Sequence, residues 1–159
     1  MRLLNDRASD VIKKDMILLQ TKFQMKDEVL HALVQKAGEA GLISDETLFL
    51  NAVLNREAEV PTAIGYQIAI PHGKSEVVKT PFIGFLQTEE EFIWTKGHEE
   101  QVKLVFLIGI PAENENNIHL KFISQLSKKL LDEEFRNQLI EEKNQEKVFK
   151  LLRSINVVS

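Results

Sequence analysis

The chain has 159 residues, of which 43% are hydrophobic and 28% are charged, a balance typical of one globular domain with a single core. Its formal charge of −4 argues against a nucleic-acid-binding surface, and the absence of cysteine excludes disulfides, thiolate catalysis and cysteine-based zinc sites. We therefore expect one domain over residues 1–159 that binds no nucleic acid.

The N-terminal segment does not resemble a targeting or membrane segment. Residues 1–6 lack the apolar core of a signal peptide, and no apolar run approaches the roughly 20 residues that span a bilayer. Residues 1–15 form a polar lead-in, expected to be helical in part around residues 8–13, and the apolar residues 16–19 could form a strand or begin a loop. We expect a cytoplasmic protein without direct membrane insertion.

Two amphipathic helices are predicted next. Apolar residues recur at helical spacing within residues 21–41, and Gly38 and Gly41 are expected to end this helix. Ser44 is the expected N-cap of the second helix, which is predicted to run to about Glu57.

The middle of the chain predicts strands. Residues 67–70 and 82–86 have the composition of short buried strands, and residues 92–94 could form a brief strand or a loop packed on the core. Residues 102–110 are nearly all apolar, which predicts a central strand covered on both faces, ended by Pro111.

The last third of the chain predicts three helices, over residues 114–131, 133–141 and 145–155. Strands are mixed with helical pairs rather than alternating strictly with single helices. We therefore predict an α/β fold, a three-layer α/β/α sandwich with a mixed sheet of about four or five strands.

The segment of residues 61–74 contains the strongest candidate for chemistry. Pro71 lacks the N–H that a strand interior needs, so sheet pairing is expected to end there, and Gly73 permits a positive φ or a close approach of the backbone to a ligand. His72 lies between them at the carboxyl end of a strand, where open α/β sheets place their chemistry. By itself, such a histidine is as often an ordinary turn residue.

The other histidines differ in their surroundings. His31 lies off the apolar stripe of its helix and His98 lies in a polar turn, so both are expected on the solvated surface. His119 borders the buried face of its helix, in the first turns, where the positive end of the helix dipole lowers the pKa of an imidazole. His72 and His119 each follow a strand ended by proline, so they converge if those strands are parallel neighbours.

Arg56 is placed at the end of the helix that leads into this segment. It either stabilises the helix dipole or offers a guanidinium that binds a phosphoryl group through two N–H groups.

Other catalytic motifs fail. Residues 73–75 resemble the end of a Walker A loop, but that motif needs glycine where this chain has Ile68. No cluster has the spacing of metal ligands, and no Gly-x-Ser-x-Gly motif occurs. We expect neither a metal nor a cofactor.

Together, residues 62–65 and 68–74 resemble the active-site signature of enzyme IIA domains in the fructose–mannitol class of the bacterial phosphoenolpyruvate-dependent sugar phosphotransferase system. Residues 51–57 are similar to the arginine-bearing helix end of that family, and residues 119–126 to its second-histidine helix. The resemblance covers nearly the whole chain. This sequence departs from the family at Ala63 and Gln67, where glycine is frequent.

The resemblance implies a phosphotransferase in which His72 accepts a phosphoryl group from the carrier protein HPr and passes it to a cysteine of an EIIB domain, which works with a membrane EIIC component. Arg56, His119 and the backbone N–H groups of Gly73 and Lys74 would hold the phosphoryl oxygens. Fructose is the leading sugar, with mannitol and galactitol-like substrates open. The alternatives are a nitrogen-related regulatory EIIA that binds other proteins according to phosphorylation, and a scaffold without phosphorylation.

Overall fold

The computed structural model describes residues 11–113 and 117–155. In chain order its elements are β1 (Ile12–Thr21), α2 (Lys26–Glu39), α3 (Glu46–Glu59), β2 (Ala63–Gly65), β3 (Ile68–Ala69), β4 (His72–Ser75), β5 (Phe82–Ile93), β6 (Gln101–Pro111), α4 (Ile118–Lys129), α5 (Glu133–Glu141) and α6 (Gln145–Arg153). None of the helices in these two ranges is both long and apolar enough to cross a bilayer.

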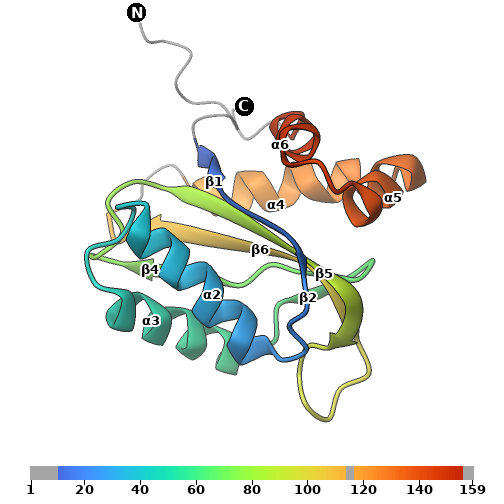
Figure 1. Ribbon diagram of the computed structural model, residues 1–159. Coiled ribbons are helices and arrows are strands. Elements are labelled where there is room, and N and C mark those ends of the chain that lie inside the picture. Colours follow the sequence, from blue (N-terminus) through green and yellow to red (C-terminus); the bar gives the residue numbers. More distant parts are fainter. Residues whose placement is uncertain (1–10, 114–116, 156–159) are drawn as a thin grey trace, which may run out of the picture.

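The helices cover both faces of one sheet, which confirms the predicted three layers (Figure 1). Helices α2 and α3 pack on one face through a cluster that includes Leu30, Leu33 and Phe49. Helices α4, α5 and α6 pack on the other face, where Phe122 and Leu139 are fully buried. Because each helix buries one apolar stripe, the sheet between them must be apolar on both sides.

The sheet has six strands in the described residues, more than the four or five expected. Its order is β1-β5-β6-β3-β2, and β4 also pairs with β6. Strands β5 and β6 are antiparallel, whereas β1 is parallel to β5, and both β3 and β4 are parallel to β6. The additional strands are the short β2 and β4, of three and four residues, too short to show a period in the sequence.

The start of the chain differs from its prediction. Strand β1 begins at Ile12, so residues 12 and 13 are extended rather than helical, and the candidate run at 16–19 is the middle of a ten-residue strand. Residues 1–10 lie outside the described part of the chain. β1 pairs only with β5 at the edge of the described sheet, and an edge strand tolerates polar residues that hide its pattern.

The two following helices were predicted with shifted ends. The N-cap of α3 is Asp45, not Ser44, because the Asp45 carboxylate accepts the Leu48 N–H at 3.0 Å. The Ser44 N–H instead donates to the Val77 carbonyl at 2.9 Å. Helix α2 begins only at Lys26, and α3 continues two residues past Glu57.

Sheet pairing does not end at Pro71, contrary to expectation. The Pro71 carbonyl accepts the Ile108 N–H at 3.0 Å, and β4 begins at the next residue with His72 paired to Ile108. Proline removes a donor but keeps its acceptor, so a parallel ladder can continue across it. The candidate histidine is therefore part of the sheet rather than part of a loop.

The second half of the chain agrees more closely. Strand β6 is the predicted central strand, with residues 104–110 all buried. Strand β5 continues past residues 82–86 through an irregularity in register between Gln87 and Phe92, so the uncertain segment at 92–94 is largely strand. Helix α5 has the predicted bounds, whereas α4 begins at Ile118 and α6 ends at Arg153.

Candidate functional site

His72 is positioned by a direct contact between β4 and α3. A Cβ atom on Gly73 would lie 2.8 Å from Val53 Cγ2 and 3.2 Å from both Phe49 Cε1 and the Val53 backbone nitrogen. Gly73 is not among the residues with positive φ. Its glycine is therefore explained by the close approach of a helix, not by a turn or a ligand.

The His72 ring is held in one orientation by its own backbone. Nδ1 lies 3.1 Å from the carbonyl oxygen of Ile70. Because a carbonyl oxygen only accepts hydrogen bonds, Nδ1 must carry the proton, and Nε2 keeps its lone pair. The half-buried ring thus presents an unprotonated nitrogen away from the sheet.

The charge state of His72 suits a nucleophile. Burial is the largest influence and lowers its pKa below the ordinary value of 6.5, opposed by the hydrogen bond to Ile70. The Arg56 guanidinium lowers the pKa further, whereas the carboxylates of Glu57 and Glu59 raise it. With the pKa below 6.5, the imidazole is largely neutral at pH 7.

His119 lies beside His72, in the first turn of α4. The centroids of the two imidazole rings are 5.8 Å apart and the rings are tilted by 32°. Their strands, β4 and β6, are parallel neighbours as the convergence of these histidines requires. Helix α4 is held against the sheet by Phe122, whose ring centroid lies 5.5 Å from that of Phe106.

The surroundings of His119 differ from those expected. Its pKa is lowered, but the causes are burial, then the positive charges of His72 and Lys74. Its Nδ1 is buried without a hydrogen-bond partner in the described residues. A buried ring nitrogen left without a partner costs about 1–3 kcal/mol, so the site is polar groundwork that a bound group can complete.

Arg56 reaches the site from the last turn of α3. Its Nη1 donates to the Val60 carbonyl at 2.9 Å, which folds the side chain back over the helix end. The guanidinium has five N–H donors and its charge acts on His72. Both interpretations from the sequence, a helix-end cation and a cation near His72, describe the same side chain.

The sheet distinguishes between the two predicted backbone donors. Because the Ile108 N–H donates to the Pro71 carbonyl, the alternation of a parallel ladder turns the Gly73 N–H toward β6 and the Lys74 N–H toward the opposite edge of β4. The Gly73 N–H is thus directed at the sheet. The geometry favours Lys74 over Gly73 as a donor to a ligand, which corrects the expectation for Gly73.

The comparisons with known proteins identify the family. The sequence model described as "Phosphoenolpyruvate-dependent sugar phosphotransferase system, EIIA 2" matches residues 10–155. The chain belongs to this EIIA family. The match spans His72, His119 and Arg56, so the site described above lies inside the family's domain.

Relatives of this EIIA chain carry fructose in their names. It is 30% identical over 147 residues to the fructose-specific EIIA component of Haloferax volcanii, covering 92% of this chain and 95% of that protein. It is 32% identical over 146 residues to the fructose-specific EIIABC component of Bacillus subtilis, covering 92% of this chain but only 23% of that longer protein.

The fold is shared with a regulatory protein. The crystal structure of the nitrogen regulatory protein IIA-Ntr from Neisseria meningitidis matches with a TM-score of 0.81 at 24% identity, covering 91% of this chain and 97% of that one.

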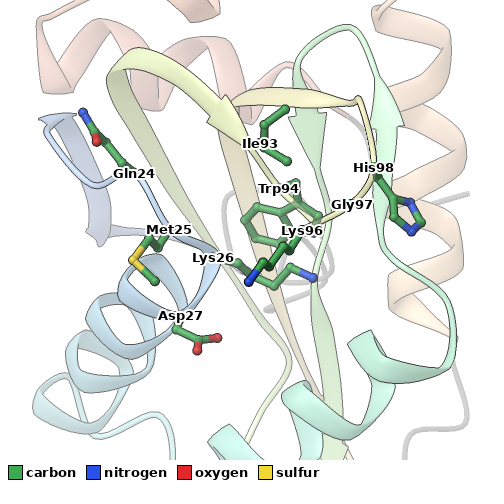
Figure 2. Close-up of a pocket in the computed structure, with 9 residues that line it drawn as sticks. All are labelled: Gln24, Met25, Lys26, Asp27, Ile93, Trp94, Lys96, Gly97 and His98. Carbon is green, nitrogen blue, oxygen red and sulfur yellow. The ribbon is translucent and has the colours of Figure 1, made fainter.

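A cavity of about 630 Å³ lies apart from the histidine pair of this EIIA domain (Figure 2). It is formed by the start of α2 and the loop after β5, and is lined by Gln24, Met25, Lys26, Asp27, Ile93, Trp94, Lys96, Gly97 and His98. His98 is exposed, as predicted from its polar turn.

Sequence reasoning missed two buried polar residues of this region, Glu57 and Thr62, each 5% exposed. The available signal was an acidic residue next to Arg56 on a helix that otherwise turns apolar residues inward. Their partners lie too far away in sequence to be identified from spacing alone.

Proposed function

We propose that His72 accepts a phosphoryl group from the phosphohistidine of HPr and transfers it to a cysteine of an EIIB domain. The observation that carries this proposal is the fixed His72 ring, with Nδ1 bound to the Ile70 carbonyl and its face 5.8 Å from His119. A neutral imidazole with one free nitrogen is the species that attacks phosphorus.

Each transfer exchanges one bond to phosphorus for another. In the first, the lone pair of His72 Nε2 forms an N–P bond while the N–P bond of the carrier breaks, and the carrier imidazole leaves with that electron pair. In the second, a thiolate of EIIB forms an S–P bond and Nε2 recovers its lone pair. The proton on Nδ1 remains on the Ile70 carbonyl throughout.

The surrounding cations and N–H groups stabilise the transferred group. The transition state is loose, with negative charge on the three peripheral oxygens of phosphorus. Arg56, His119 and the Lys74 N–H are positioned around His72 to donate to these oxygens. The buried, unpartnered nitrogen of His119 is available for such a contact.

The pathway proposed is sugar uptake, with fructose as the leading substrate. The names of the Haloferax and Bacillus relatives support fructose, and the EIIABC name of the second supports EIIB and EIIC as partners. The sugar itself is bound by the membrane component, so the EIIA site does not select it. We propose that the transfers take place in the cytoplasm.

A regulatory role is the second candidate. The fold match to IIA-Ntr supports a protein in which the same histidine is phosphorylated but the output is phosphorylation-dependent binding of other proteins. The two candidates differ at the second transfer. Rapid passage of label from His72 to a purified EIIB domain supports sugar uptake, and its absence with intact phosphorylation supports regulation.

The first transfer is tested by phosphorylation with phosphoenolpyruvate, enzyme I and HPr. Wild-type protein is expected to take up one acid-labile phosphate, and His72→Ala to take up none. His98→Ala is the matched control, since His98 is exposed and lies in the loop after β5. Normal labelling of His72→Ala contradicts the assignment.

A further inference from the structure

A buried carboxylate lies directly beside the site. Both oxygens of Glu57 accept hydrogen bonds from Thr62, from the backbone N–H to Oε2 at 3.0 Å and from the hydroxyl to Oε1 at 2.7 Å. Trp94 Nε1 donates to Oε2 at 2.8 Å, and Lys26 Nζ lies 3.2 Å from the same oxygen. A carboxylate that is only 5% exposed needs such partners, and this one has four donors.

A continuous series of hydrogen bonds leads from this carboxylate to His72. Thr62, held by Glu57, accepts the Ile70 N–H on its carbonyl oxygen at 3.0 Å. The Ile70 carbonyl in turn lies 3.1 Å from His72 Nδ1. The position of the Ile70 peptide, and with it the orientation of the His72 ring, therefore depends on where Glu57 holds Thr62.

The same turn also holds Arg56. Its Nη1 donates to the Val60 carbonyl at 2.9 Å, between the two residues that the Glu57 carboxylate ties together. The turn formed by residues 57–62 thus fixes the guanidinium and the imidazole relative to each other. Transfer requires such alignment, since small displacements of reacting groups slow reactions strongly.

We propose that Glu57 is a positioning residue for phosphoryl transfer, which through Thr62 and Ile70 holds the His72 ring with Nδ1 protonated and Nε2 free. This inference rests on the proposed function of His72. A buried, charged cluster is seldom the most stable way to fill such a space, and well-packed apolar residues often serve stability as well. What the carboxylate adds is a fixed acceptor for both polar groups of Thr62.

The end of α3 supplies a matched control. Glu59 is exposed, and its charge raises the pKa of His72 in the same direction as that of Glu57. The charged and titratable groups facing His72 are Arg56, Glu57 and Glu59 from α3 and His119 from α4. Replacing Glu59 by glutamine removes one negative charge near His72 without touching Thr62.

The test compares Glu57→Gln with Glu59→Gln by the ¹⁵N NMR shifts of the His72 ring in the unphosphorylated protein. Wild type and Glu59→Gln are expected to show the Nδ1–H tautomer alone. Glu57→Gln is expected to show a mixture of tautomers, and its phosphorylation by HPr to slow by about tenfold or more. A folded Glu57→Gln protein with the tautomer and rate of Glu59→Gln overturns the proposal.

A second pair of variants decides the matter if Glu57→Gln does not fold. Thr62→Val loses the hydroxyl that donates to Glu57 Oε1, whereas Thr62→Ser retains it. We expect mixed tautomers and slower phosphorylation in Thr62→Val and wild-type behaviour in Thr62→Ser; equal behaviour of the two overturns the proposal. The tautomer is measured without phosphate, so failure of wild-type His72 to accept phosphate would contradict only the proposed function.

Discussion

At the residue scale, the groups that would bind a phosphoryl group also keep the nucleophile uncharged. Burial lowers the pKa of both imidazoles most, and each has a positive neighbour that lowers it further, Arg56 for His72 and Lys74 for His119. A protonated imidazole has no lone pair to attack phosphorus. A cation beside His72 thus acts twice, on the oxygens of the incoming group and on the proton of the acceptor.

The ionisation of His72 gives a prediction about pH. The ring is expected to titrate below pH 6.5, so more than half of it is neutral at that pH. Arg56→Gln removes a charge that lowers the pKa and should move the titration upward, whereas Glu59→Gln removes a charge that raises it and should move the titration downward. NMR titration of the His72 Cε1 proton measures both shifts. An unchanged midpoint in Arg56→Gln would show that its charge does not reach His72.

At the element scale, the sequence predicted long elements well and short ones poorly. Strand β6 and helix α5 were recognised because eight or more residues carry a consistent pattern. Strand β4 was missed because its pairing comes from β6, more than thirty residues later, and Pro71 concealed it. The convergence of His72 and His119 was predictable because both follow strands that run in the same direction. The Glu57 network was not, since its partners lie on α2 and after β5.

The β2–β3 hairpin explains the two departures from the family's glycines. Tyr66 and Gln67 form its two-residue turn, with φ of 56° and 65°, in the left-handed region that favours glycine. Ala63 is not among the residues with positive φ, so alanine there is unstrained. Only the departure at Gln67 therefore has a conformational cost, about 1 kcal/mol.

Gln67→Gly is accordingly expected to stabilise the protein. The relief of strain is reduced by the greater freedom of glycine in the unfolded chain and by loss of the exposed hydrogen bond from Gln67 to Glu91, leaving a gain of about 0.5 kcal/mol. That gain corresponds to a rise in Tm of about 1–2 °C. Ala63→Gly is the matched control and should lower Tm, since its backbone needs no glycine. A lower Tm for Gln67→Gly in calorimetry would contradict this explanation.

At the scale of the whole molecule, the site lies where the layers meet at the sheet. Helix α3 from one layer carries Arg56, β4 of the sheet carries His72, and α4 from the other layer carries His119 (Figure 1). Each layer is fixed by its own buried cluster, so the relative placement of the three side chains depends on both faces of the sheet. Donor and acceptor proteins must both reach the single free nitrogen of His72 between these layers.

Because HPr and EIIB would need the same nitrogen, they are expected to use overlapping surfaces and to exclude each other. Leu120, next to His119 and 56% exposed, is an apolar residue positioned for both. Leu120→Glu should slow transfer from HPr and to EIIB by about tenfold each, as loss of an apolar contact worth more than 1 kcal/mol would. Leu131→Glu, 77% exposed just beyond the other end of α4, is the matched control and should leave both rates unchanged. Stopped-flow transfer assays measure the rates, and a ternary complex of HPr, EIIB and this chain in sedimentation experiments would contradict mutual exclusion.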